Sequence, residues 1–333
     1  MPRSLEAAGR RSPVGAWVVS SPVETVVGID IGGTKLAAGV VDGAGRVVSA
    51  ERVPTPRGSD AGAEVLWFAV RGLVDAVLDQ AVMARAPTPV ACGVGCGGPM
   101  TLGGSEVSPL NIPGWRDFPL RQRLMDHLDL PVIVDNDAKA LALGEGWIGA
   151  AQESTDFLAM VVSTGVGGGI VLDGRLLDGA AGNAGHIGHV VVEPGGRICA
   201  CGARGCLEAE ASGTAIASIT GRPPAVAPVE VRRRAGALVG RAVASVANLL
   251  DLRLAVVAGS VALGFGDDLF EPARAEADRV ACLGFSRGTE IVPAAKRAWT
   301  PGASFGLTAD PGAVWVSAVD RSGNQSTTVQ VQW

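Results

Sequence analysis

Residues 23–53 of the chain read VETVVGIDIGGTKLAAGVVDGAGRVVSAERV. Apolar residues fill TVVGID, a Gly-Gly turn follows, and KLAAGVVD is apolar again, which predicts two strands joined by a short turn. Asp42-Gly43 then leads into GRVVSAERV, and Asp-Gly between two apolar runs is a strong hairpin signal. The stretch therefore predicts three consecutive strands at the start of a sheet.

The rest of the chain alternates between predicted strands and predicted helices. Helical periodicity over 63–85 is followed by PVACGVGCGGP at 89–99, which predicts a buried strand running into a Gly turn, and a long helical pattern over 232–252 precedes another strand. A second strand, glycine loop and strand at 157–177 loosely repeats the first unit. This alternation predicts an α/β fold.

The length of 333 residues and the hydrophobic content of 47% suit two domains of about 150 residues each. We expect four parts: a disordered leader over 1–22, an N-terminal α/β domain over 23–134, a larger α/β domain over 135–295, and an atypical tail over 296–333.

The charge and hydropathy of the chain exclude several classes of partner. A net charge of −5 and a pI of about 5.3 give no electrostatic footprint for nucleic acid. No apolar run reaches the roughly 18 residues of a membrane span. Residues 1–22 lack the continuous apolar segment of a signal peptide. These features predict a cytoplasmic protein with reduced thiols and with neither a nucleic-acid nor a membrane partner.

The first glycine loop, DIGGTK, has the composition of an anion site. Its two glycines let backbone amides approach an anion closely, and the threonine and lysine add donors. An ordinary turn explains Gly32 and Gly33 but not the flanking Asp30, Thr34 and Lys35. We therefore predict that this loop binds phosphate, although it is not a Walker loop because G-x-x-x-x-G-K-[ST] is absent.

The second glycine loop, STGVGGGI at 163–170, offers Thr164 and four glycines, among them Gly165 and Gly167. A phosphate cradle and a tight hairpin both fit this composition, and we favour the cradle. A third segment, GVGCGG at 93–98, formally matches the dinucleotide fingerprint. Because proline follows it and no helix is predicted there, it fails the context that the fingerprint requires.

One histidine and three cysteines are clustered in the sequence as His189-x9-Cys199-x-Cys201-x4-Cys206. One imidazole and three thiolates satisfy a closed tetrahedral zinc site, which leaves no open position for catalysis. A disulfide between Cys199 and Cys201 is disfavoured because C-x-C pairs rarely form without strain. The spacing therefore predicts a structural zinc ion.

The segment VDND at 134–137 offers two carboxylates at the end of a predicted strand. A carboxylate there could take the proton from a hydroxyl that attacks a phosphoryl group. The residues alone leave Asp135 and Asp137 both open for that role. They also leave open that Asp137 only caps a helix beginning at Ala138.

Several motifs together resemble the ROK family of sugar kinases, within the actin-like, ribonuclease-H-like ATPase superfamily. The segments that carry the resemblance are, in order, GIDIGGTKLAAGVVD (28–42), GCGGP…SPLNIPGW (95–115), VDNDAKALALGE (134–145), STGVGGGIVLDG (163–174) and GHIGHVVVEPGG followed by CACG and GCLE (185–208). Weaker similarity continues to about residue 293. The resemblance implies two ribonuclease-H-like domains with a cleft between them.

The resemblance also implies an activity, ATP-dependent phosphorylation of a hexose hydroxyl, most simply glucose to glucose 6-phosphate, in a homodimer. It selects Asp137 as the general base. Around the sugar it implies Gly98, Asn111, Asn136, His186, His189 and Glu208. The phosphates would lie with Mg²⁺ between the two glycine loops, at Asp30, Gly32, Gly33, Thr34, Lys35, Thr164, Gly165 and Gly167, with the metal held through water by Asp30. The adenosine would lie near Gly259 and Ser260.

Two departures from the family pattern bear on this expectation. The signature normally reads Gly-Glu-x-Gly-His, but here it is Gly185-His186-Ile187-Gly188-His189, so imidazole replaces a sugar-binding carboxylate. After residue 295 the family usually continues into a final apolar helix that packs on the N-terminal domain. The tail here has no sustained helical period, which brings its effect on stability and domain closure into question.

Three alternative functions follow from the same features. Another hexose or an N-acetylhexosamine is an alternative substrate. A catalytically weak sugar-binding protein is an alternative because of His186 and the tail. A sugar-responsive repressor is disfavoured because only about 22 residues precede the first glycine loop, whereas a helix-turn-helix module needs about 60.

Overall fold

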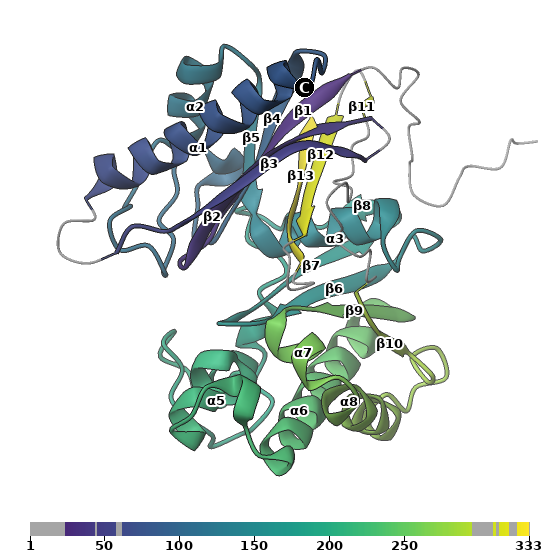
Figure 1. The fold of residues 1–333 in the computed structure, drawn as a ribbon. Coiled ribbons are helices and arrows are strands. Elements are labelled where there is room, and N and C mark those ends of the chain that lie inside the picture. Colours follow the sequence, from purple (N-terminus) through teal and green to yellow (C-terminus); the bar gives the residue numbers. More distant parts are fainter. Residues whose placement is uncertain are drawn as a thin grey trace, which may run out of the picture.

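The computed structural model describes residues 24–43, 45–57, 62–294, 309–310, 313–319 and 325–332. The expected leader and much of the expected tail lie outside the described residues. Within the described part, two five-stranded sheets lie one above the other, each covered by helices (Figure 1). No helix of this part is long and apolar enough to cross a membrane.

The first sheet has the strand order β3-β2-β1-β4-β5. Its strands are β1 (Thr25–Ile31), β2 (Lys35–Asp42), β3 (Val47–Pro54), β4 (Pro89–Cys96) and β5 (Val132–Asn136). The first three pair antiparallel, as the opening stretch predicts, and β4 and β5 then add in parallel. Helices α1 (Ala63–Met83) and α2 (Leu120–Leu128) cover one face, where Val27 and Ile29 pack against Leu66 and Val70.

The second sheet has the order β10-β9-β6-β7-β8 and repeats this pattern of pairing. Its strands are β6 (Phe157–Val162), β7 (Val166–Leu172), β8 (Arg175–Leu176), β9 (Leu254–Ala258) and β10 (Glu290–Pro293). Three antiparallel strands are again followed by two parallel ones. The loose repeat in the sequence is therefore a repeat of topology, and the α/β prediction is confirmed.

Most helices of the second half cover one face of this sheet. They are α4 (Leu207–Ala211), α5 (Gly213–Thr220), α6 (Val229–Leu250), α7 (Ser260–Phe265) and α8 (Asp267–Val280). Short 3-10 turns lie at Ile187–His189 and Pro224–Val226 in this half and at Leu102–Gly104 in the first half. Leu158 and Met160 point into this core, whereas Phe157 and Ala159 point to the opposite face. The period of two along β6 thus separates two buried layers.

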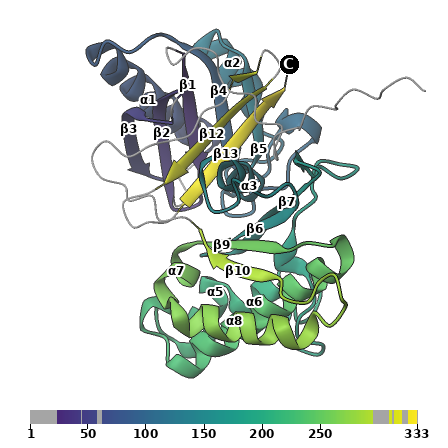
Figure 2. The same cartoon turned by 90° about the vertical axis from the view of Figure 1, so that its right-hand side faces the viewer.

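Helix α3 (Asp137–Ile148) fills the space between the two sheets and contacts β4, β5, β6 and β7 (Figure 2). Glycines on β7 allow this close approach. A Cβ at Gly167 would lie 2.9 Å from Ala138 Cβ, and one at Gly169 would lie 2.7 Å from Ala142 Cβ. The helix therefore holds its first residue, Asp137, at the junction of the two sheets.

The described part of the tail consists of strands. β11 (Ala309–Asp310), β12 (Ala313–Val319) and β13 (Gln325–Gln332) form a small antiparallel sheet. β12 and β13 lie over the face of the first sheet that α1 and α2 leave uncovered, and β13 also contacts α3 (Figure 2). These strands thus lie on the N-terminal half, where the family pattern would place a helix.

Candidate active site

The proposed base lies at the point where the first sheet passes into α3. β5 ends at Asn136, so the boundary expected between residues 134 and 135 falls inside a strand. The helix begins at Asp137, one residue earlier than the sequence suggests, and Asn136 is its N-cap. Asn136 Oδ1 accepts the Ala138 amide at 3.0 Å, and Asp137 Oδ1 accepts the same amide at 2.9 Å. Because Asn136 already caps the helix, a role as helix cap does not account for an aspartate at position 137.

The electrostatic environment suits Asp137 to accept a proton. Burial of its carboxyl group, together with the nearby negative charge of Asp30, raises the pKa of Asp137 to about 6. Asp30 lies on β1, near the end of that strand, and is itself buried. A carboxylate with this pKa is still ionised near neutral pH, yet it binds a proton more readily than an exposed aspartate does.

Three of the residues expected around the sugar lie together. A Cβ at Gly98 would lie 3.6 Å from Asn136 Nδ2 and 3.9 Å from His186 Cε1. The His186 side chain is exposed, and partial desolvation of its ring, followed by the nearby His189, lowers its pKa. At neutral pH its imidazole is therefore uncharged and offers one donor and one acceptor.

The first glycine loop packs directly on the segment that carries Asn111. A Cβ at Gly33 would meet Asn111 Cβ at 2.5 Å, so only glycine fits this contact. A pocket of about 370 Å³ opens beside the contact. Gly33 and Thr34 of the first loop line this pocket, together with Asn111. Thr164 of the second loop lines it as well. The two glycine loops, which belong to different sheets, therefore face one cavity.

The second glycine loop is linked to the residues expected around the sugar and the adenosine. Glu208 Oε2 accepts the Val166 amide at 2.9 Å, and a Cβ at Gly165 would lie 2.7 Å from the same oxygen. Ser163 Oγ and Ser260 Oγ lie 2.9 Å apart. Gly259, with φ of 102°, precedes Ser260 in a conformation that favours glycine.

Gly32 and Gly167 have structural tasks in the two loops. The Gly32 amide donates to the Lys35 carbonyl at 3.0 Å and so closes the first turn. The place of Gly167 is explained by its contact with α3, described above. Phosphate binding by these residues and by Lys35 stays a prediction.

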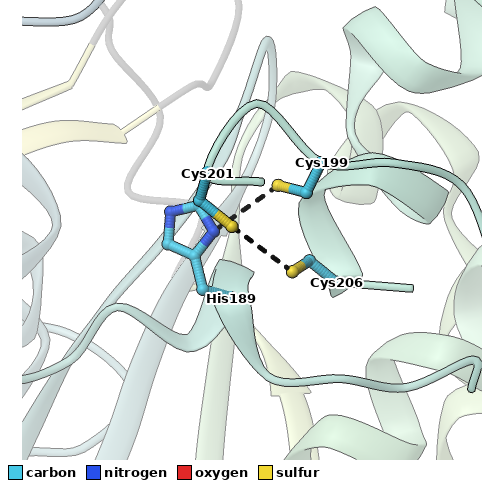
Figure 3. A group of neighbouring side chains, drawn as sticks. All are labelled: His189, Cys199, Cys201 and Cys206. Atoms are coloured by element: carbon cyan, nitrogen blue, oxygen red, sulfur yellow. Dashed lines mark hydrogen bonds between the residues drawn. The ribbon is translucent and has the colours of Figure 1, made fainter. Parts of the chain in front are cut away.

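The four predicted zinc ligands form a compact group (Figure 3). One ligand atom from each of His189, Cys199, Cys201 and Cys206 lies within 4.8 Å of all the others. The Cys199 Sγ to His189 Nδ1 distance and the Cys201 Sγ to Cys206 Sγ distance are both 3.7 Å. Zinc–sulfur bonds of about 2.3 Å in a tetrahedron separate two sulfurs by about 3.8 Å, so this arrangement and donor set fit Zn²⁺.

The cluster joins separate parts of the second half. His189 ends a 3-10 turn, whereas Cys206 immediately precedes α4. Backbone pairing reinforces this link, because Val191 forms a β-bridge with Cys206 and the Leu207 amide donates to Val190. Within the described residues, this is the only group of three or more such side chains placed to hold a metal ion.

Some residues of the site were not predicted from the sequence. Lys139, only 2% exposed, lies with its Nζ 3.1 Å from Asp135 and 2.7 Å from Asp178. Glu210, also buried, forms ion pairs with Arg234 and with Arg197, which precedes Cys199 by two residues. A charged residue inside an apolar helical pattern was the available signal for Lys139.

Comparison with known proteins identifies relatives of the whole two-sheet unit. The ROK family model matches residues 26–303. N-acetylmannosamine kinase of Yersinia pseudotuberculosis is 37% identical over 254 residues, which cover 72% of this chain and 83% of that protein.

Two solved structures show the same likeness in three dimensions. The ROK hexokinase of Thermus thermophilus is 36% identical with a TM-score of 0.70, over 82% of this chain and 94% of that one. The ROK glucokinase of Streptomyces griseus, solved with glucose and AMPPNP, is 31% identical with a TM-score of 0.69, over 81% and 94%. The sequence motifs, the repeated sheet topology and these matches agree, and the chain belongs to the ROK family, within the actin-like ATPase superfamily.

Proposed function

We propose that the protein is an ATP-dependent sugar kinase, which transfers a phosphoryl group to a hydroxyl of a hexose or an N-acetylhexosamine. The observation that carries the proposal is the place of Asp137. Asp137, whose carboxyl group has a pKa of about 6, starts the helix between the two sheets and follows Asn136. Asn136 and His186 both lie within 4 Å of the place that a Cβ at Gly98 would take. A base is thus held beside neutral polar groups suited to sugar hydroxyls.

In this proposal Asp137 takes the proton of the attacking hydroxyl as the new phosphorus–oxygen bond forms. The nearby charge of Asp30 favours that transfer, because a proton on Asp137 relieves the repulsion between the two carboxylates. Asn136 and His186 would orient the sugar, and Glu208 would accept from a further hydroxyl. Most of the rate in phosphoryl transfer comes from such positioning and from charge neutralisation.

The nucleotide would bind where the two glycine loops face one pocket. Thr34 and Thr164 line that pocket from opposite sheets. The contact of Ser163 Oγ with Ser260 Oγ supports the proposal that the adenosine binds near the second loop. Asp30 offers the oxygen ligands that Mg²⁺ prefers, and the ion would supply charge neutralisation to the phosphates. Closure of the two halves would exclude water from the transfer.

The sugar is the finer part of the proposal. Glucose is the substrate expected from the sequence motifs, and the names of the relatives support both a hexose and N-acetylmannosamine. His186 lies where the family pattern has glutamate, so it is the residue to examine for this choice. We further propose that zinc at the cysteine cluster is structural. The homodimer and the cytoplasmic location stay predictions.

A coupled assay of ADP release tests the function. Purified protein with ATP and Mg²⁺ is given glucose, mannose, fructose, N-acetylglucosamine and N-acetylmannosamine in turn. We expect sugar-dependent ADP release with one or two of these sugars, abolished in Asp137→Ala. Sugar binding by calorimetry without ADP release for any sugar would instead favour the sugar-binding alternative.

A further inference from the structure

Three consecutive carbonyl groups of the first glycine loop are all held by one short segment, Thr55-Pro56-Arg57, which we name the strap. Thr55 Oγ1 donates to the Gly32 carbonyl at 2.6 Å. Arg57 donates to the Gly33 carbonyl twice, from Nε at 3.1 Å and from Nη2 at 2.7 Å. The Thr55 amide donates to the Thr34 carbonyl at 3.1 Å.

We propose that Thr55 and Arg57 are positioning residues for nucleotide binding, because they fix the orientation of the peptide groups in the first glycine loop. The proposal rests on the proposed kinase function and adds two residues to it. Neither residue belongs to the motifs that identify the loop, since both follow β3, more than 20 positions along the chain.

The planarity of the peptide group links each held carbonyl to the direction of the next amide. In a trans peptide group the carbonyl and the amide point in opposite directions. When the strap holds the Gly32 carbonyl, the Gly33 amide points away from the strap, and holding the Gly33 carbonyl turns the Thr34 amide the same way. A loop that binds phosphate needs its amides directed at the anion and its carbonyls directed away from it. The strap imposes that separation before nucleotide arrives.

Arg57 contributes in a second way. Its guanidinium holds a full positive charge beside the Gly33 carbonyl oxygen. That charge polarises the peptide group between Gly33 and Thr34 and makes the Thr34 amide a stronger donor. Arg57 also lines the pocket of about 370 Å³ together with Thr34 and Thr164. The planar fork of arginine suits two bonds to one acceptor, so this contact fixes a direction as well as a charge.

A purely structural role for the strap predicts different behaviour from a positioning role. Arg57 is exposed, so its loss should leave the fold intact, whereas Thr55 is buried and 5% exposed. Thr55→Val keeps the shape of Thr55 and its backbone bond to Thr34, and removes only the hydroxyl bond to Gly32. This variant changes no charge, so it separates loop geometry from simple attraction between Arg57 and phosphate.

The test compares Arg57→Met, Thr55→Val and the double variant with the wild-type protein. A matched control is Arg46→Met, at the other end of the same hairpin, where Arg46 binds Asp42. The readouts are the dissociation constant of Mg²⁺-AMPPNP by calorimetry, the KM values for ATP and for sugar, and the melting temperature.

We expect Thr55→Val, which loses one hydrogen bond, to weaken AMPPNP binding and raise the KM for ATP by about fivefold, and Arg57→Met, which loses two, to do so by at least as much. The KM for sugar should stay within twofold. The double variant should lose less than the product of the single effects, because both residues hold one loop. The control should match the wild type.

Two results would overturn the proposal. Normal AMPPNP affinity in Thr55→Val with weak affinity in Arg57→Met would show that Arg57 acts only by attracting the phosphates with its charge and that the strap does not orient the loop. Equal increases in both KM values with a lowered melting temperature would reduce it to fold stability. Failure of the kinase function itself is separate, because the wild-type protein would then phosphorylate no sugar while AMPPNP binding still tests the strap.

Discussion

The carboxylate of Glu208 accepts a hydrogen bond of 2.9 Å from the backbone amide of Val166. Glu208 follows Cys206 by two residues, whereas Val166 lies within the second glycine loop, where β7 begins. The same oxygen lies where Gly165 leaves room for it. A residue expected at the sugar is thus fixed by a loop expected at the phosphates, and it lies on the helix that begins directly after Cys206 of the cysteine cluster.

Loss of one cysteine ligand should therefore affect both stability and sugar binding. We expect Cys201→Ser to lose about one zinc per chain by elemental analysis, to lower the melting temperature, and to raise the KM for sugar more than the KM for ATP. Cys282→Ser, at an exposed cysteine outside the cluster, is the control. A metal-free Cys201→Ser protein with full activity would refute structural zinc.

Replacement of the proposed base should stop turnover without loss of the fold. We expect Asp137→Asn to retain sugar binding and to reduce kcat by at least about 10²-fold, as loss of a general base does. Its amide oxygen can still accept from Ala138, so the start of α3 should persist. Sugar affinity is measured by calorimetry, and kcat by ADP release. A kcat close to the wild-type value would remove Asp137 from the mechanism.

The raised pKa of Asp137 also predicts a pH dependence with a definite sign. The base works only when ionised, so kcat/KM should fall as pH drops through about 6. The contribution of Asp137 to the free energy of unfolding changes with pH in the opposite direction to kcat/KM. The folded state binds the proton more tightly than the unfolded state, so ionisation of Asp137 costs stability as pH rises from about 4 to about 6.

The comparison with Asp137→Asn isolates that contribution. The variant removes a buried charge, so it should melt at the same temperature as the wild type or higher at pH 7, and the difference should shrink at pH 4. Melting temperatures of both proteins across this range provide the measurement. A variant that loses stability relative to the wild type as pH rises from about 4 to about 7 would show that the carboxylate is stabilised in the fold, contrary to the raised pKa.

The buried ammonium group of Lys139 should stabilise the loop that leads to His186. Its Nζ donates to Asp178 at 2.7 Å and lies 3.3 Å from the Gly182 carbonyl, four residues before His186. We expect Lys139→Met to cost about 2 kcal/mol of unfolding free energy, less than for a fully buried pair because Asp178 is 65% exposed. Chemical denaturation measures the loss. Lys139→Arg should recover part of it, and equal stability of Lys139→Met and the wild type would exclude the role.

The sequence predicts the fold where local signals and topology agree. Asp42-Gly43 and the Gly-Gly turn of the first loop specify the β1–β2–β3 unit, and the second glycine loop specifies its counterpart. The cysteine spacing predicts a cluster because its members are close in sequence. Contacts between distant residues have no local signal, so the bonds of Arg57 to Gly33 and of Glu208 to Val166 emerge only from the folded chain.

His186 lies where the family signature has glutamate. A glutamate there would accept hydrogen bonds from sugar hydroxyls as a fixed anion, whereas neutral imidazole offers one donor and one acceptor. His186 Cε1 and Asn136 Nδ2 both lie within 4 Å of the place that a Cβ at Gly98 would take, so a change of chemistry at His186 should act on the expected sugar side of Asp137. We expect His186→Glu to change the ratios of kcat/KM among hexoses and N-acetylhexosamines by at least about tenfold, or about 1.4 kcal/mol.

Charge and shape can be separated at this position. His186→Gln keeps a donor and an acceptor without a charge, so it should retain the wild-type order of sugars with lower activity, whereas His186→Glu should alter that order. The matched control is His127→Gln. His127, the one histidine outside the 186–189 segment, lies on α2 and binds Asp75 on α1. Ratios that stay within twofold for every sugar in His186→Glu would mean that Asn111, Asn136, His189 and Glu208 set specificity without this residue. In that case the imidazole is a tolerated replacement, and the choice between glucose and N-acetylmannosamine must depend on the remaining contacts of the pocket.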